Sequence, residues 1–287
     1  MTRMYSKSHP CHPFNPLTMN FKLVLRSVII FLTLLAVALA ALALILPRVL
    51  QIGPPLRRTP PPPMLNAPRG EMPAETGGLT EWSQYAGGTY GVVGSGFFMQ
   101  LPEGTLVGVT TSHSVWTLGT LNHTLEHIAF SLPDHTDFVA EFDTLYGRPG
   151  TPRLWADLSI DYVLLQANQT IDPALTLTPD PRGAPQPGER VTIYGGFGGG
   201  NGGRRIFEGT VQTADATGVW VFMDENFEPG LMSGSPLVSQ HTGQVVGMAI
   251  AAGRRGDRLL IGFHPIGHIV EMAEAVAEFP KIAGYRR

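Results

Sequence analysis

The sequence predicts an all-β domain that is closed by one C-terminal helix and preceded by one membrane-spanning helix. About a dozen short apolar runs, rich in β-branched and aromatic residues, alternate with Gly, Pro, Asn and Asp. This pattern is typical of a barrel or sandwich. Residues 266–279 instead place apolar residues at helical spacing. Residues 27–46 are 20 consecutive uncharged positions, about the length that crosses a bilayer as a helix.

The N-terminal region is expected to anchor the chain in a membrane. Residues 1–22 are interpreted as a cytoplasmic tail and residues 23–47 as an uncleaved signal-anchor. The apolar run is longer than that of a typical signal peptide. Cleavage near Ala38-Leu39-Ala40 is the alternative, and it would release a secreted protein. The slight excess of Lys and Arg before the run favours an extracytoplasmic position for the rest of the chain.

Residues 48–70 are proline-rich, and such segments act as semi-rigid spacers in a polyproline II conformation. Residues 71–287 are expected to form the folded domain. The predicted strands, in chain order, lie in TYGVVGSGFFMQL, GTLVGVTTS, HIAFSL, DFVAEFD, DYVLLQA, ERVTIYGGF, RIFEGTVQTA, GVWVFMD, SPLVS, GQVVGMAIAAG and RLLIGFHP. IGHIVEMAEAVAEF follows the last strand as the closing helix.

Composition excludes several classes of function. The formal net charge is −3, and no basic stripe with interleaved aromatic residues is present, which argues against a nucleic-acid partner. Cys11 is the single cysteine and precedes the predicted domain. The domain therefore has no internal disulfide and no cysteine ligands for zinc.

Three residues are candidates for nucleophilic catalysis. Ser233 lies in the turn-like stretch PGLMSGSPL, His113 follows the strand-like VGVTT, and Asp161 opens the strand-like DYVLL. A serine hydroxyl needs an imidazole to accept its proton and a carboxylate to orient the imidazole. Loops at the ends of strands can deliver all three groups to one place.

The order of these motifs resembles that of trypsin-like serine proteases, in particular the compact, disulfide-free bacterial kind. The resemblance covers about residues 85–280. It is carried by GSGFFM (94–99), TTSHS (110–114), DYVLL (161–165), MSGSPL (232–237) and GQVVGMAIAAG (243–253), with the His, Asp and Ser positions 48 and 72 residues apart.

The resemblance implies two six-stranded antiparallel β-barrels of the chymotrypsin-like type, with the active site between them. It makes His113 the general base, Asp161 the orienting acid and Ser233 the nucleophile of a membrane-anchored serine endopeptidase. No cofactor or metal is needed, and the partner is a polypeptide substrate.

The resemblance also assigns backbone and pocket positions. The amides of Leu231 and Ser233 would form the oxyanion hole, although the family usually has glycine where this chain has Leu231. The residues expected to contact substrate are Phe227, Ile250, Ala251 and Ala252. We expect substrates with a small or apolar side chain in the pocket. Glu228 favours the alternative, a basic side chain.

Two other functions compete with this hypothesis. Leu231 motivates the first, a weak or inactive protease-fold module that binds or regulates a partner. The second is a zinc peptidase, because His123-Thr-Leu-Glu126-His127 spells H-x-x-E-H. That chemistry requires a helix, which would place both histidines on one face, and no long helix is predicted there.

Overall fold

The computed structural model describes residues 30–32, 34–35, 58–116, 123–152 and 157–285. The chain divides into two compact units, residues 1–50 and 51–287. The predicted tail and signal-anchor lie outside the described residues, apart from five helical positions between 30 and 35. In the described ranges, no helix is long and apolar enough to cross a membrane.

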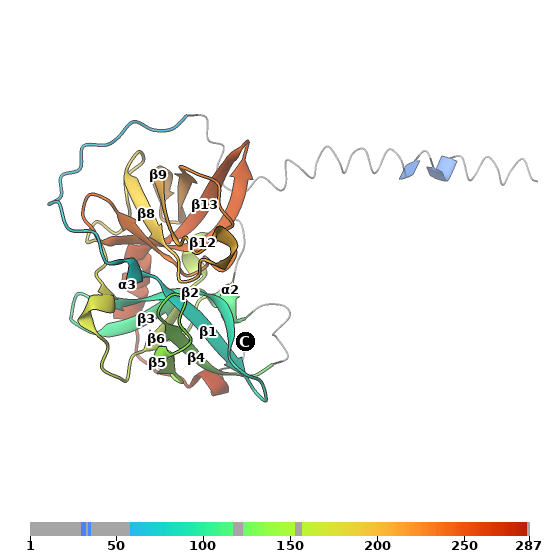
Figure 1. Cartoon of the computed structure of the whole chain (residues 1–287), viewed down its shortest axis with the longest axis vertical. Coiled ribbons are helices and arrows are strands. Elements are labelled where there is room, and N and C mark those ends of the chain that lie inside the picture. Colours follow the sequence, from blue (N-terminus) through green and yellow to red (C-terminus); the bar gives the residue numbers. More distant parts are fainter. Residues whose placement is uncertain (1–29, 33, 36–57, 117–122, 153–156, 286–287) are drawn as a thin grey trace, which may run out of the picture. The chain divides into compact units, whose positions relative to one another are not determined.

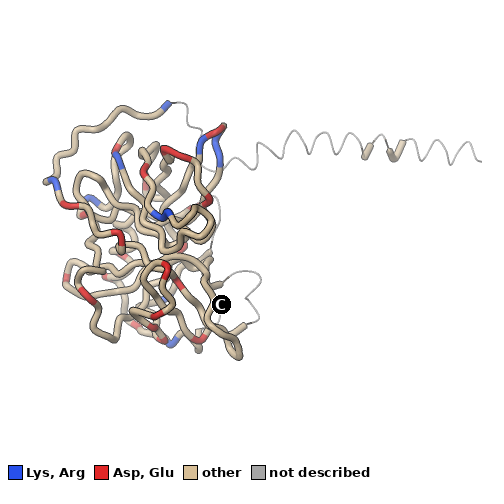
Figure 2. Tube along the Cα trace, in the orientation of Figure 1, with Lys and Arg blue, Asp and Glu red and all other residues tan. Residues whose placement is uncertain are grey.

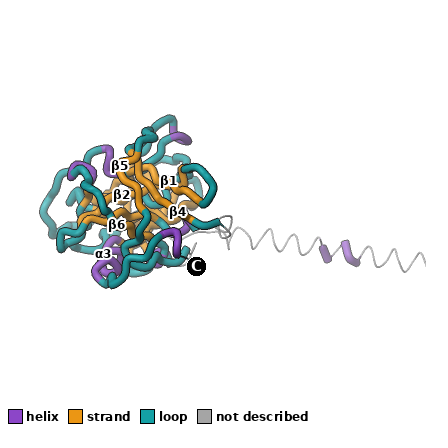
Figure 3. Tube along the Cα trace, turned by 90° about the horizontal axis from the view of Figure 1, so that it is seen from below, coloured by secondary structure: helices purple, strands orange, loops and turns teal. Residues whose placement is uncertain are grey.

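The first half of the 51–287 unit is a seven-stranded sheet (Figures 1 and 3). Six strands follow the order β5-β4-β1-β2-β3-β6, and β7 pairs in parallel with β2. The strands are β1 (Leu79–Tyr85), β2 (Gly91–Gln100), β3 (Leu106–Thr110), β4 (Leu125–Ser131), β5 (Phe138–Phe142), β6 (Val163–Gln166) and β7 (Thr176–Leu177). Strands β1 and β7 were not predicted, because neither is an apolar run of β-branched residues.

The prediction of a closed six-stranded barrel is wrong for this first sheet. Its path ends at β5 and β6, which do not pair as strands. The chain just after β5 reaches β6 through one isolated bridge, Leu145 to Leu165. The amide of Tyr146 donates to the carbonyl of Leu164, at 2.8 Å. The sheet therefore curls almost to closure, but only a short contact joins its edges.

The second half is a closed barrel, as predicted. Its strands follow the order β10-β13-β12-β11-β8-β9. They are β8 (Arg190–Tyr194), β9 (Ile206–Asp215), β10 (Gly218–Met223), β11 (Pro236–Ser239), β12 (Val245–Arg255) and β13 (Arg258–Pro265). Because the barrel is closed, each of its six strands pairs with a neighbour on both sides and no edge is left free.

A shared apolar core joins the two halves. One buried cluster contains Phe97 and Val109 from the first sheet together with Met248 and Leu260 from the barrel. Helix α3 (Ile266–Glu274) adds Ile269 to the same cluster. The burial of apolar surface is the main stabilising contribution here, at about 25 cal/mol for each Å² removed from water. The core thereby fixes the loops that both halves extend toward each other.

Helix α3 confirms the predicted closing helix but ends earlier, at Glu274 and not at Phe279. After it, the carbonyls of Glu278 and Pro280 accept hydrogen bonds from Gly147 and Leu145. These long-range bonds replace the helical bonds that the local pattern favours, since Pro280 cannot donate one of its own.

Part of the predicted proline-rich spacer lies against the second barrel (Figure 1). Arg258 donates to the hydroxyl of Thr59 at 3.3 Å, and Nε2 of His241 lies 2.7 Å from the carbonyl of Ala67. The amide of Gly70 donates to the carbonyl of His241 at 3.0 Å. This segment is therefore a surface strap of the domain over these residues.

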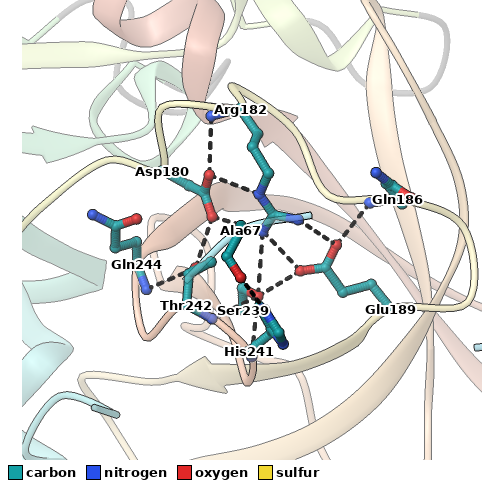
Figure 4. A network of polar contacts seen from close by, with 9 residues as sticks. All are labelled: Ala67, Asp180, Arg182, Gln186, Glu189, Ser239, His241, Thr242 and Gln244. Atoms are coloured by element: carbon teal, nitrogen blue, oxygen red, sulfur yellow. Dashed lines mark hydrogen bonds and ion pairs between the residues drawn. The ribbon is translucent and has the colours of Figure 1, made fainter. Parts of the chain in front are cut away.

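The strap meets a buried ionic network (Figure 4). Arg182 pairs with Asp180 at 2.7 Å and with Glu189 at 2.9 Å, and both carboxylates are almost fully buried. Thr242 and Ser239 donate further hydrogen bonds to these carboxylates. The network ties the loop before β8 to the turn between β11 and β12.

Charged residues are interspersed along the rest of the domain, with Lys and Arg positions next to Asp and Glu positions (Figure 2). Arg190, for example, contacts both Glu208 and Asp224. This mixed pattern agrees with the absence of a basic stripe in the sequence.

Candidate active site

The candidate site begins with His113, which lies in the short helix α2 (Ser112–Val115) directly after β3. Its Nδ1 is 2.8 Å from Oδ2 of Asp161. The other oxygen of Asp161 accepts the backbone N–H groups of Ser112 and His113, at 2.8 and 3.0 Å. The Asp161 side chain is fully buried. Three donors therefore hold this carboxylate, and the carboxylate holds the imidazole in one orientation.

Ser233 completes a continuous relay. Its Oγ is 2.8 Å from Nε2 of His113. The serine lies on the loop between β10 and β11, so the three predicted residues come from three separate segments. The structure brings all three together, in the geometry that lets an imidazole accept a hydroxyl proton.

The loop before Ser233 is a tight turn. The amide of Met232 donates to the carbonyl of Pro229 at 3.1 Å, and Leu231 between them has φ of +63°. A positive φ at the third turn position defines a type II turn, in which glycine is usual. The side chain of Met232 is buried in the barrel core and anchors the turn.

Two backbone donors next to the serine hydroxyl have no acceptor among the described residues. Within the described part of the chain, neither the N–H of Leu231 nor that of Ser233 has an acceptor. They belong to residues two positions apart, flanking Met232. Such unoccupied donors beside a serine hydroxyl can stabilise a developing oxyanion. Leu231 thus has the positive φ that glycine, the usual residue of the family at this position, adopts without strain.

A small pocket opens beside Ser233. Its volume is about 80 Å³, and its walls include Met232, Ile250, Ala251 and Ala252. Its other lining residues, Pro229, Ala249 and Ile261, are also apolar. Because about 10–15 Å³ of such volume is enough to hold one water, the pocket has room for a short apolar side chain.

A comparison with protein-family models identifies the family of this chain. The model of the trypsin-like peptidase domain matches residues 94–248, just over half of the chain. The chain belongs to the trypsin-like peptidase family. The matched range includes His113, Asp161 and Ser233.

The solved structures that resemble this chain are distant in sequence. A Glu endopeptidase in complex with MPD is 14% identical, with 72% of this chain and 93% of that chain covered and a TM-score of 0.46. Tobacco etch virus protease with product is 13% identical, with 78% and 87% covered and a TM-score of 0.47. Human heparin binding protein is 13% identical, with 74% and 96% covered and a TM-score of 0.48. No curated protein matches the chain.

Neither Phe227, an expected substrate contact, nor Glu228 lines this pocket. Phe227 stacks on Phe207 with ring centroids 3.7 Å apart, and it does not line the 80 Å³ pocket. The carboxylate of Glu228 accepts the amide of Gly230 at 3.2 Å, so it is directed at its own loop. Among the expected contacts, only Ile250, Ala251 and Ala252 line the pocket.

The H-x-x-E-H motif is not helical. Glu126 and His127 lie in β4, where successive side chains point to opposite faces. His127 is 3.7 Å from Glu141, at the weak end of ion pairing. In the ranges that the structure describes, no group of three His, Cys, Asp or Glu side chains could hold a metal ion. The helix that the zinc hypothesis requires is therefore absent at this motif.

Sequence reasoning missed Glu81 in β1. Its side chain is fully buried, and neither carboxyl oxygen forms a well-aligned hydrogen bond with a described residue. Burial raises its pKa well above the ordinary value, and the nearby hydroxyls of Thr110 and Ser114 lower the pKa only in part. A Cβ atom added to Gly94, its partner in β2, would lie 2.8 Å from Oε2 of Glu81. The carboxyl group therefore fills the space between β2 and α2, and the only signal was an acidic residue inside an unpredicted strand.

Proposed function

We propose that this chain is a serine endopeptidase that hydrolyses peptide bonds through His113, Asp161 and Ser233. The observation that carries the proposal is the unbroken relay, with both contacts of the imidazole at 2.8 Å. Membership of the trypsin-like peptidase family supports the same reaction.

In the proposed mechanism, Nε2 of His113 takes the proton of Ser233 as Oγ bonds to the peptide carbonyl carbon. The imidazolium then gives that proton to the leaving amine, which breaks the peptide bond and leaves an acyl-enzyme. Water repeats the sequence, with His113 again as the base, and releases the acid. Asp161 stabilises the imidazolium throughout, and this chemistry requires no metal or organic cofactor.

The free N–H groups of Leu231 and Ser233 are proposed to bind the oxyanion of the tetrahedral intermediate. Loss of one such donor costs on the order of 10²–10³ in rate. The same turn motivates the second candidate function, a module that binds partners without turnover. A leucine with φ of +63° is strained, and relaxation of the turn would direct its N–H away.

The pocket favours a substrate with a small apolar side chain before the cleaved bond. Its lining carries no charged residue to pair with a basic or acidic side chain. A substitution of Ala252 by leucine would fill the pocket. We expect it to lower cleavage after alanine or valine while leaving the rate of serine labelling by a small probe within about threefold, because the relay is untouched.

The location of the enzyme remains part of the proposal. We propose that residues 23–47 retain the chain in the membrane and that the peptidase faces the extracytoplasmic side, where it meets polypeptide substrates. The charge pattern supports no nucleic-acid partner. Carbonate extraction of membranes tests the anchor, since a cleaved and secreted form would appear in the soluble fraction.

The decisive test is labelling of the full chain, in detergent micelles, by a fluorophosphonate probe. Ser233→Ala is the control for the labelled residue, and a metal chelator is the control for the zinc hypothesis. We expect labelling that requires Ser233 and His113 and ignores the chelator. Labelling that survives His113→Ala would refute the mechanism.

A folded chain that fails to label would favour the binding module. Leu231→Gly then separates the two candidates, because glycine adopts the required turn without strain. Labelling that returns in this variant would identify a protease with a disabled oxyanion hole. Continued absence of labelling would leave the binding function as the better proposal.

A further inference from the structure

Ser95, in the middle of β2, connects the first sheet to the nucleophile loop. Its hydroxyl donates to the carbonyl of Leu231 at 2.8 Å and accepts the amide of Gly196 at 3.0 Å. Its own amide donates to the carbonyl of Ser233 at 2.8 Å. The residue is fully buried. One side chain and its backbone therefore hold two carbonyl groups of the loop that carries the nucleophile.

The carbonyl groups on this part of the loop are all held, including that of Met232, which accepts the amide of Ser235 at 3.0 Å. The carbonyls of Leu231 and Ser233 are held by Ser95, while the N–H groups of the same two residues have no acceptor within the described ranges. The peptide that carries the Ser233 N–H is flanked on both sides by anchored peptides. The N–H of Leu231 belongs to the peptide group between Gly230 and Leu231. The strained φ of Leu231 sets the direction of this group relative to the next one, whose carbonyl Ser95 holds.

This strain needs an opposing force. For a non-glycine residue, the left-handed conformation is about 5- to 30-fold less populated than the right-handed one. If the carbonyl of Leu231 were free to turn, small rotations of both neighbouring peptides would let φ become negative. The N–H of Leu231 would then leave its present direction. The hydrogen bond from Ser95 opposes that rotation, together with the bond that the Met232 amide of the same peptide group donates to the carbonyl of Pro229.

We infer that Ser95 is a positioning residue, whose hydroxyl holds Leu231 in the left-handed turn and so keeps both oxyanion donors in place. The inference rests on the proposed serine-protease function for its kinetic consequence. Its structural part, the coupling of Ser95 to the strain of Leu231, stands without that function. A chain with glycine in place of Leu231 would need the anchor less.

The kinetic test is a double-mutant cycle of Ser95→Ala and Leu231→Gly in the full chain, read by the rate of fluorophosphonate labelling. Ser95→Ala should slow the maximal labelling rate about 10- to 100-fold, up to the effect of losing one oxyanion donor. The probe concentration for half-maximal rate should not change. In the Leu231→Gly background, the same substitution should slow labelling by no more than about threefold, because glycine carries no strain.

Ser83→Ala is the matched control. Ser83 is a buried serine of the adjacent strand β1, and its hydroxyl has no partner among the described residues. We expect labelling at the wild-type rate. Equal losses from Ser95→Ala in both backgrounds would overturn the inference while leaving the proposed function intact, since Ser95 would then act only through general stability.

The unfolding temperatures of the same four variants decide the structural part. Ser95→Ala should lower the midpoint by about 2–10 °C through the lost buried hydrogen bonds. The loss should be at least about 2 °C smaller in the Leu231→Gly background. Additive shifts would overturn the inference even if the wild-type chain never labelled, and non-additive shifts would support it.

Discussion

The stability of the domain should fall on acidification because of one buried histidine, His264. This residue is the penultimate position of β13, and its ring is fully buried. Nδ1 is 2.9 Å from the carbonyl of Pro265, while Nε2 has no partner among the described residues. His268 from α3 stacks on the ring, and Tyr162 meets it edge-on. A proton on Nε2 would therefore be buried without a well-aligned acceptor, and the backbone of Ser159 stabilises the protonated ring only in part.

The magnitude follows from the pKa. Burial, helped by the neighbouring His268, lowers the pKa of His264 from 6.5 to about 4, although the backbone groups of Pro265 and Ser159 and the charge of Asp161 partly offset this. The unfolded chain binds the proton more tightly, so stability present above pH 6.5 is lost as the pH falls toward 4. Acidification from pH 7.5 to 5 should cost about 2 kcal/mol, and the full loss below pH 4 is about 3 kcal/mol.

The assay is thermal unfolding of the full chain between pH 7.5 and pH 5. A loss of about 2 kcal/mol lowers the midpoint by about 4–8 °C for a domain of this size. His264→Asn keeps a donor for the carbonyl of Pro265 but does not titrate, so it should remove that part of the pH dependence. His268→Asn, on the half-exposed partner ring, should keep most of it. A variant lacking His264 that loses as much stability as the wild type would refute the reasoning.

Three further changes have defined outcomes. Asp161→Asn should lower the rate of Ser233 labelling by about 10⁴-fold, because an amide favours the wrong imidazole tautomer; a loss below tenfold would contradict the relay. Glu81 has a raised pKa, so its burial costs more stability as the pH rises above 4.5. Glu81→Gln should accordingly flatten the decline in unfolding midpoint between pH 5 and pH 9, and an unchanged slope would count against this assignment. Arg182→Ala leaves the two buried carboxylates beside it unpaired and should lower the free energy of unfolding by about 3 kcal/mol in denaturant titration; a loss under about 1 kcal/mol would show that water reaches the network.

Much of the fold could be predicted because the strands are local patterns. Apolar runs bounded by turn residues became strands at both ends of the chain, from GSGFFM in β2 to RLLIGFHP in β13. The strand β1, LTEWSQY, was missed because polar residues on both of its faces, such as Thr80 and Glu81, are buried. A strand with both faces covered does not need the alternation that marks a half-exposed one.

The three residues of the candidate relay could be predicted from the sequence, but the residues that surround and hold them could not. His113, Asp161 and Ser233 were singled out from motifs and their order, and the structure brings them together. The roles of Ser95 and Glu81 were not, although GSGFFM was part of the resemblance. Their contacts join residues far apart in sequence, such as Ser95 and Leu231, 136 positions apart. No local pattern encodes such a pair.

The sequence by itself determined the β-rich class, the closing helix and the three residues of the candidate relay, because strand periodicity and catalytic motifs are written in short stretches of chain. Only the tertiary structure decided that the first sheet stops short of a full barrel, that the strap lies on the second barrel, and that Leu231 adopts φ of +63°. Each of these depends on hydrogen bonds between distant segments. Their geometry exists only once the shared core has fixed the two halves of the domain.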